Sequence, residues 1–331
     1  MLVSPAFHGY HSGIAAALSN QGFEVLTHIY DKSSTVFDAL ANRAAVNDLG
    51  NFAAKVKQQK TERAIEELRR IKPDLVVVVK GDLLGADWWQ EISASKVPSW
   101  LWIYDELANT QFPAEALEYV TNIASYSKAD TQSLRSRGIS VAYVPGGFDS
   151  HEVAGPSQNL GHAVTFTGAR YPQREAILRD VAAAGIPVKA YGREWSRKFT
   201  DVVRTGQYRN PGFATASDLT RAQSYAVMAS SLASVNHHGT HDGFNMRMFE
   251  ACGVAGVHLV DRIDVDIFYE PGTEVFTFES SAELVAKITE IQKVPELATK
   301  VRAAAQKRTL AKHTLDSRMA DLLAMRDYRH D

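Results

Sequence analysis

The segment from 241 to 256 combines residue types that recognise a bound anion. Among its polar and glycine positions are Asp242, Gly243, Asn245, Arg247 and Glu250. The spacing of the apolar residues predicts a helix that begins near Phe244, with Asn245 and Arg247 in its first turn. Free backbone N–H groups in a first helical turn, together with the helix dipole, favour a phosphate or a sugar oxygen. Arg247 can neutralise the same anion, so we expect an anion site here.

The two carboxylates of this segment have different candidate roles. Asp242 stands just before the predicted helix, where it either caps that helix or contacts a ligand. Glu250 lies eight residues further on and is too far along the helix to cap it. It is either an exposed helical residue or an acceptor of hydrogen bonds from two vicinal hydroxyls, such as those of a ribose.

A second group of cations follows an expected strand at 163–167. Gly168 ends this strand, and Arg170 and Arg174 lie in the connection to the next helix. Arginines are usually solvated surface charges, but a guanidinium also offers forked donors to phosphate oxygens. We therefore count both arginines as candidate phosphate contacts.

Two adjacent histidines, His237 and His238, end another expected strand at 233–236. Neighbouring side chains on a strand point to opposite faces, so the pair is not expected to share one metal ion. The single cysteine, Cys252, excludes an internal disulfide and a cysteine-rich metal site, and a small buried thiol is its expected role.

Length and composition indicate a two-domain globular protein. The chain has 331 residues, of which 45% are hydrophobic and 22% are charged, so it suits two domains of about 150 residues each. A formal net charge of −2 gives no electrostatic reason to expect nucleic acid as the main partner. No run of about 18 apolar residues and no signal-peptide pattern is present, so we expect a cytoplasmic protein without a membrane span.

The first half of the chain reads as alternating strands and helices. A strand at 2–4, a loop at 5–13 that carries His8 and His11, a helix at 14–20 and a strand at 24–28 form a β-loop-α-β unit. This unit lacks the G-x-G-x-x-G spacing of dinucleotide-binding proteins. A polar helical region follows at 35–70.

Two later runs in this half contain mostly apolar residues without alternation. Residues 74–80 and 99–104 have this pattern, which is typical of parallel strands covered by helices on both faces. The second run places Asp105 at the carboxyl end of its strand, where α/β proteins usually locate their chemistry. A turn capped by Asp105 is the alternative.

The Pro-Gly-Gly sequence at 145–147 breaks any regular element, so we place the end of the first domain near residue 150. Weaker strands precede it at 122–126 and 140–143. The α/β alternation then resumes in a second domain, 151–312, and a helix at 313–331 ends the chain. The elements expected there are strands at 163–167, 188–191, 233–236, 257–260 and 275–278, and helices at 217–230, 264–269 and 282–291.

The second half resembles the CgeB-like (spore-maturation-protein type) glycosyltransferases, within the broader GT-B, family-4-like class. The resemblance rests on the Asp-Gly-Phe-Asn-Met-Arg-Met-Phe-Glu-Ala-Cys-Gly motif at 242–253, on 268–275, and on 166–168 with Arg174. Weaker similarities in the first half lie at 72–76, 101–105 and 144–149. Family-4-like enzymes carry two glutamates separated by seven residues. Glu250 matches the second, and Asp242 replaces the first.

The resemblance implies an α/β protein of GT-B fold, with two Rossmann-like domains whose parallel sheets face a cleft. The first domain would bind the acceptor and the second a nucleoside-diphosphate sugar, and the C-terminal helix would pack back toward the N-terminal domain. Protein cations and helix N-termini would hold the diphosphate, so no metal and no cofactor is expected. The candidate donor contacts are Gly168, Arg170, Arg174, His238, Gly243, Phe244, Asn245, Arg247 and Glu250.

The catalytic candidates come from both halves. Asp242 would orient the donor sugar, and Asp105, His8 or His11 would bind or deprotonate the acceptor hydroxyl. The expected reaction moves a sugar to a hydroxyl of a polysaccharide, protein, metabolite or modified nucleic acid base, with retention at the anomeric carbon by family analogy. A non-catalytic sugar-nucleotide or polysaccharide-binding protein of a surface assembly is the alternative. A nicotinamide-dependent oxidoreductase has only the βαβ architecture in its favour.

Overall fold

The computed structural model of the chain divides into two compact units, which we describe one at a time. The structure describes residues 1–32, 50–110, 112, 116–155, 157, 160–239 and 241–325. Unit 1 comprises Met1–Gly146, Asp242–Phe244 and Leu315–Asp331, and unit 2 comprises Gly147–His241 and Asn245–Thr314. The predicted helical stretch 35–49 and the last six residues of the predicted helix 313–331 lie outside the described residues.

Unit 1 contains a parallel sheet of six strands in the order β2-β1-β3-β4-β5-β6. Its strands are β1 (Leu2–Ser4), β2 (Thr27–Ile29), β3 (Val76–Val79), β4 (Ser99–Ile103), β5 (Asn122–Ser125) and β6 (Ala142–Tyr143). Every residue of β3 and β4 is buried. Strands of a parallel sheet are covered on both faces, and these two apolar runs form strands as predicted.

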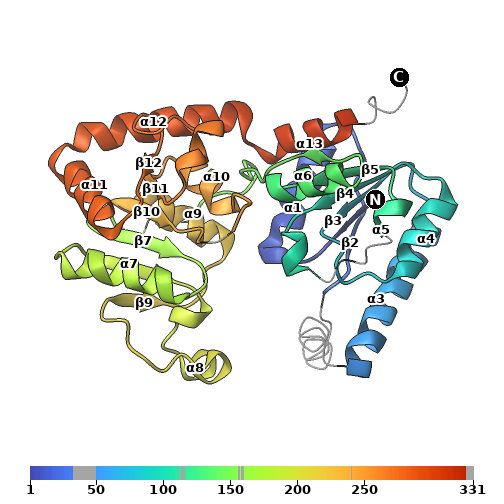
Figure 1. Ribbon diagram of the computed structural model, residues 1–331, viewed down its shortest axis with the longest axis horizontal. Helices are drawn as coiled ribbons and strands as arrows, with labels where there is room; N and C mark the ends of the chain where they lie inside the picture. The colour runs from blue at the N-terminus through green and yellow to red at the C-terminus, as the bar shows by residue number, and fades with distance from the viewer. Residues whose placement is uncertain are drawn as a thin grey trace. The chain divides into compact units, whose positions relative to one another are not determined.

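Helices cover both faces of this sheet (Figure 1). They are η1 (Phe7–Gly9), α1 (Tyr10–Asn20), α3 (Gly50–Ile71), α4 (Ala86–Ser95), η2 (Leu107–Asn109), α5 (Ala116–Tyr119), α6 (Lys128–Ser136) and α13 (Leu315–Ala324). The C-terminal helix α13 packs on α1, which confirms that it returns to the N-terminal domain. Asn20 Nδ2 donates to Asp316 Oδ1 at 2.7 Å, and Arg318 Nε donates to the Gly146 carbonyl at 2.9 Å.

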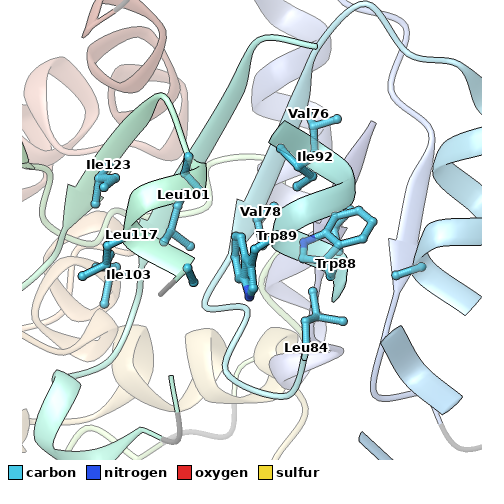
Figure 2. Close-up of a cluster of buried hydrophobic side chains, with 14 of the residues drawn as sticks. Val76, Val78, Leu84, Trp88, Trp89, Ile92, Leu101, Ile103, Leu117 and Ile123 are labelled. Atoms are coloured by element: carbon cyan, nitrogen blue, oxygen red, sulfur yellow. The ribbon is translucent and has the colours of Figure 1, made fainter. Parts of the chain in front are cut away.

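The core of unit 1 is built around two adjacent tryptophans. Trp88 and Trp89 of α4 are completely buried, and they lie against Val78 of β3 and Leu84 (Figure 2). Leu101 and Ile103 of β4, Ile123 of β5 and Leu117 of α5 extend the same cluster (Figure 2). Burial of an aromatic or large aliphatic side chain contributes about 1.5–3 kcal/mol, so this cluster fixes the strands whose carboxyl ends carry Lys80 and Asp105.

Unit 2 contains a second parallel sheet of six strands, in the order β12-β11-β10-β7-β8-β9. Its strands are β7 (Val164–Thr167), β8 (Val188–Tyr191), β9 (Ala214–Ala216), β10 (Ala233–Asn236), β11 (His258–Val260) and β12 (Phe276–Thr277). Its helices are α7 (Pro172–Ala183), η3 (Arg193–Trp195), α8 (Phe199–Thr205), α9 (Arg221–Ser230), α10 (Met246–Gly253), η4 (Ile263–Ile267), α11 (Ser281–Lys293) and α12 (Pro295–Lys312). Helix α7 contacts α11, whereas α10 contacts both α9 and α12 (Figure 1).

Several boundaries differ from the sequence-based expectations. Helix α1 begins at Tyr10, so His11 lies in a helix and not in the predicted loop 5–13. The predicted helix 264–269 is the 3-10 helix η4, and the predicted helix 217–230 is shorter because β9 and the Thr220 capping box precede it. The short elements α8 and β9 were not predicted, because a few residues carry too little periodicity to identify them.

Each sheet reverses its strand order once. In unit 1 the reversal lies between β1 and β3, and in unit 2 it lies between β7 and β10. In open α/β sheets, ligands bind outside the carboxyl ends of the strands at such a reversal. None of the helices that the structure describes has the length and apolar character needed to cross a membrane.

Candidate functional site

The strand reversal of unit 2 is bordered by two of the predicted site positions. Strand β7 ends at Thr167 and leads into Gly168, while β10 ends at Asn236 and leads into His237. These strands are neighbours in the sheet. A ligand site in this unit is therefore expected outside the carboxyl ends of β7 and β10.

Arg174 lies in the first turn of α7, beside the carboxyl ends of β7 and β10. Its side chain is buried, its Nε donates to the His237 carbonyl at 2.9 Å, and its Nη1 donates to the Ala169 carbonyl at 3.3 Å. The guanidinium lies 4.6 Å from the Tyr171 ring centroid. Burial, and then the charge of Arg247, lower the pKa of Arg174 to about 10. The side chain remains a cation at neutral pH, and no carboxylate among the described residues forms an ion pair with it.

Arg247, in the first turn of α10, lies against Gly168. A Cβ atom built on Gly168 would be 3.1 Å from both Cζ and Nη2 of Arg247. Gly168 has a φ of 143°, a conformation that L side chains rarely adopt. The Arg247 side chain forms no hydrogen bond or ion pair with the residues that the structure describes. Two nearby guanidiniums without an ion-paired carboxylate among the described residues form a candidate site for an anion of more than one charge.

The N-cap residue of α10 makes no side-chain cap bond. The helix begins at Met246, two residues later than predicted, and Asn245 is its N-cap without a side-chain cap bond. The Asn245 amide instead exchanges two hydrogen bonds with the amide of Asn236, at 3.1 and 3.0 Å. This pair ties the start of α10 to the end of β10. Amides of the first turn and the helix dipole then favour an anion beside Arg247.

Glu250 is buried in the third position after Arg247, with only 3% of its surface exposed. The alternative of an exposed helical residue is therefore wrong. The charge of Glu250 adds to burial in raising the pKa of Tyr225, whose hydroxyl lies near it. A buried carboxylate one helical turn beyond the anion site is compatible with the predicted contact to sugar hydroxyls.

Arg170 has structural partners. Its Nε donates to Glu175 Oε2 at 2.8 Å, its Nη2 donates to the Arg209 carbonyl at 3.0 Å, and its guanidinium lies 5.2 Å from the Trp195 ring. Trp195 is buried as well, and its Nε1 donates to the Gly168 carbonyl at 2.8 Å. The Trp195 ring therefore packs in the core. Arg174 and Arg247 are therefore the candidate anion-binding pair, and the phosphate contact of Arg170 stays a prediction.

Asp261, which the sequence did not single out, organises the two histidines. It accepts hydrogen bonds from the backbone N–H groups of His238 and Gly239, at 2.8 and 3.1 Å, and its Oδ1 lies 3.0 Å from His238 Nδ1. Burial would raise the pKa of Asp261, but these bonds to His238 and Gly239 lower it to about 2. The sequence feature that could have identified Asp261 is its position directly after the buried strand β11.

Burial favours the neutral form of the histidines beside Asp261. Burial lowers the pKa of His238, despite the hydrogen bond to Asp261. Burial also lowers the pKa of His258 on β11 to about 3. Across the described part of the chain, no group of three or more His, Cys, Asp and Glu side chains is arranged to hold a metal ion.

The residues Asp242, Gly243 and Phe244 belong to unit 1, although the sequence placed them in the second domain. Asp242 Oδ2 accepts hydrogen bonds from Ser127 Oγ at 2.7 Å and from the Ala129 N–H at 3.0 Å. Its carboxylate therefore helps to cap α6 and does not cap α10. The predicted donor-sugar contact of Asp242 stays a prediction.

Glu106 holds the backbone of the same segment. Its Oε1 accepts hydrogen bonds from the Asp242 N–H at 2.8 Å and from the Gly243 N–H at 3.2 Å. A Cβ atom on Gly243 would lie 2.2 Å from the Tyr126 ring, so only glycine fits here. Glycine at this position thus allows close packing on Tyr126, and the predicted donor contact of Gly243 stays a prediction.

The catalytic candidates of unit 1 lie at the carboxyl edge of its sheet. Asp105 Oδ2 accepts from Lys80 Nζ at 3.0 Å, and Lys80 has a left-handed backbone with a φ of 64°. His8 follows β1 with a φ of 47°, and His11 Nδ1 lies 3.1 Å from the Ala6 carbonyl. Positive φ at non-glycine residues is costly and concentrates at functional sites. His8 and Lys80 flank the strand reversal between β1 and β3.

Comparisons with known proteins identify the fold of the chain. Residues 171–324 match a family model described as glycosyl transferase-like. The structure of Anabaena HepE in complex with UDP-glucose covers 99% of both chains, with a TM-score of 0.63 and 12% sequence identity. The chain has the GT-B glycosyltransferase fold.

Two further solved structures share this GT-B fold with the chain. A glycosyltransferase from Rickettsia africae covers 100% of this chain and 99% of its own, with a TM-score of 0.62 and 11% identity. Sucrose-phosphate synthase from Thermosynechococcus elongatus covers 98% of both chains, with a TM-score of 0.62 and 14% identity. No curated protein matches the chain. The predicted fold of two Rossmann-like domains with parallel sheets is confirmed.

Proposed function

We propose that the chain is a glycosyltransferase that moves a sugar from a nucleoside-diphosphate sugar to an acceptor hydroxyl. The observation that carries this proposal is the pair Arg174 and Arg247 at the strand reversal of unit 2. The pair lies beside an uncapped helix N-terminus and has no carboxylate partner in the described structure. A diphosphate has the charge and the length to contact both guanidiniums and the first-turn amides.

The same arrangement favours the chemical step. A diphosphate leaving group gains negative charge as its bond to the sugar breaks, so donors already aimed at it stabilise the transition state. Arg247 is free to do this, and Arg174 is held in place by two backbone carbonyls. Buried Glu250, one turn along α10, is suited to accept hydrogen bonds from the ribose hydroxyls of the donor.

Finer features of the reaction follow from the resemblance. The motif at 242–253 supports a CgeB-like, retaining enzyme. Two protein cations at the diphosphate site support a reaction that needs no metal. The bound UDP-glucose of the similar HepE structure supports a uridine nucleotide and a hexose as the first donor to try. We expect the reaction in the cytoplasm, with the acceptor contacts supplied by the edge of unit 1 that carries His8, His11 and Asp105.

A panel of nucleoside-diphosphate sugars tests this proposal. In the presence of a chelator, the parent protein should bind at least one of them and slowly release free nucleoside diphosphate by hydrolysis. Arg174→Ala and Arg247→Ala should each weaken nucleotide binding by about tenfold to a hundredfold, because each removes a charge-assisted contact. Lys287→Ala, an exposed cation of the same unit, is the control. Absence of binding across the panel would refute the proposal.

A second candidate function is a sugar-nucleotide-binding protein without turnover. The engagement of the Asp242 carboxylate with Ser127 and Ala129 favours it, because that group is then occupied in the helix cap. The two candidates differ in one readout. A transferase releases nucleoside diphosphate from the sugar it binds, whereas a binding protein returns the donor intact at every time point.

A further inference from the structure

The short helix α8 exposes one of its faces to solvent. It spans seven residues, from Phe199 to Thr205, and buries none of them. A helix this short is only marginally stable in water unless another surface covers one of its faces. Figure 1 shows α8 within the β8–β9 connection, where it contacts the 3-10 helix η3. Asp201, Val202 and Thr205 are half-buried on one face of α8, and the opposite face is exposed to solvent.

Apolar side chains form that face. Phe199 is 81% exposed and Val203 is 55% exposed, and a spacing of four residues places them on the same side of the helix. Tyr208, shortly after the helix, is 68% exposed. A cluster of large exposed apolar side chains is unusual on a soluble surface and marks a place where another molecule or a membrane binds.

Cations border these apolar residues. Arg197, Lys198 and Arg204 are exposed, and their side chains form no hydrogen bond or ion pair with any described residue. Asp201 is the single acidic residue between positions 197 and 209. Basic residues around exposed aromatic and aliphatic side chains are typical of a helix that lies in the interface of an anionic membrane.

We propose that α8 docks unit 2 on an anionic lipid surface. Arg197, Lys198 and Arg204 would attract the headgroups, while Phe199 and Val203 would enter the boundary of the acyl chains. The aliphatic Val203 distinguishes this partner from a soluble polyanion, because a β-branched apolar side chain is stabilised only on transfer to an apolar medium. This inference does not depend on the proposed transferase activity.

Cosedimentation of the full chain with vesicles tests the proposal. We expect binding to vesicles of phosphatidylcholine with phosphatidylglycerol, and little binding to phosphatidylcholine alone. Raising the salt concentration should weaken binding, because it screens the charges. The triple change Arg197→Gln, Lys198→Gln and Arg204→Gln should lower the partition constant about a hundredfold, at about fivefold per charge.

A second variant tests the apolar side chains of α8. Phe199→Ser with Val203→Ser should lower the partition constant at least tenfold while the cations remain. As an apolar control, Val153→Ser with Ile263→Ser alters two side chains of similar exposure elsewhere in unit 2. As a charge control, Lys293→Gln, Lys300→Gln and Lys307→Gln remove the same number of exposed cations. Neither control should change vesicle binding by more than about twofold.

Four outcomes would overturn the inference. They are no binding to anionic vesicles, an equal loss in the controls, equal binding to uncharged vesicles, and binding that the Phe199 and Val203 changes leave intact. In the last case a soluble polyanion such as heparin should compete, and the partner is then an acidic polymer. Dimers that disappear with the same two changes would instead assign this face to a second copy of the chain. Circular dichroism of each variant confirms that the protein remains folded.

Discussion

The guanidinium of Arg247 packs directly on Gly168, so the end of β7 and the start of α10 are in contact at one glycine. A Cβ atom at position 168 would lie 3.1 Å from Arg247 Cζ. This contact places a cation over the strand reversal, because no side chain at 168 keeps it away. The geometry of the proposed diphosphate site thus depends on Gly168, although this residue has no side chain.

Gly168→Ala should therefore weaken nucleotide binding about tenfold, because the new methyl group displaces Arg247. It should also lower the free energy of unfolding by about 1–2 kcal/mol, since φ at this position is 143°. Gly185→Ala is the matched control. Gly185 has a φ of 81° with no neighbour within 4 Å, so it should lose stability without losing affinity. Calorimetric titration and urea unfolding of both variants measure the two effects separately. Unchanged affinity in Gly168→Ala would contradict the assigned role of Arg247.

Two different ligands should distinguish the role of Glu250 from that of the arginines. Glu250→Gln keeps the size of the side chain and removes the charge that would hold two ribose hydroxyls. It should weaken binding of a nucleoside diphosphate by about tenfold and leave binding of inorganic pyrophosphate unchanged. Arg247→Ala should weaken both ligands. If Glu250→Gln affects pyrophosphate as strongly as the nucleotide, Glu250 acts on the fold of the site and not on the ribose.

The contributions of Asp242 and Ser127 to the free energy of unfolding should be coupled. Asp242→Ala and Ser127→Ala should each lower the free energy of unfolding by about 1–2 kcal/mol, because both remove bonds at the N-terminus of α6. The double variant should lose less than the sum of the two, since the shared hydrogen bond is lost only once. Urea unfolding of all three variants, with the exposed Asp218→Ala as a control, measures this. Strictly additive losses would show that the two side chains do not interact.

Acidification should destabilise the protein through His258. Its folded-state pKa of about 3 lies below the ordinary value of 6.5, so the unfolded chain binds the proton more readily. The stability from the neutral ring is complete above pH 6.5 and is lost as the pH falls toward 3. Between pH 7 and pH 5 the loss should be about 2 kcal/mol. His238, whose pKa is also lowered, adds to the loss.

His258→Leu should reduce this pH dependence. Neither ring nitrogen of His258 has a hydrogen-bond partner among the described residues. An apolar side chain of similar volume should therefore keep or raise stability at pH 7 and remove about 2 kcal/mol of the loss at pH 5. The exposed His162→Gln should leave the pH dependence unchanged. Urea unfolding at pH 7 and pH 5 measures the loss of stability in each protein. If His258→Leu loses as much stability on acidification as the parent, another group is responsible.

The sequence predicted the parts of the fold that have a strong local signal. The apolar runs of β3, β4 and β7 and the glycine-flanked helix α10 carry such signals, and the resemblance at 242–253 added the GT-B fold. Short elements such as α8 and β9 could not be predicted, because few residues distinguish them from loops. The boundary of α10 was misplaced by two residues, since the Asn236–Asn245 pair that fixes it is a tertiary contact.

The site was predicted less completely than the fold. The sequence and the resemblance singled out Arg174, Arg247 and Glu250 as candidates, and the structure places all three in one unit, around the strand reversal and α10. The sequence did not show that Arg170 would be held by Glu175, that Asp261 would fix His238, or that Asp242 would hydrogen bond with Ser127. Each of these pairs joins residues that only the folded chain brings together, so no local pattern indicates which partner a side chain will have.

A crystal structure of the protein with a bound nucleoside diphosphate tests the proposed diphosphate site most directly. We expect diphosphate oxygens within about 3 Å of the guanidiniums of Arg174 and Arg247, with the ribose hydroxyls on Glu250. A nucleotide bound away from the β7–β10 reversal, with both guanidiniums turned from it, would contradict the proposed site.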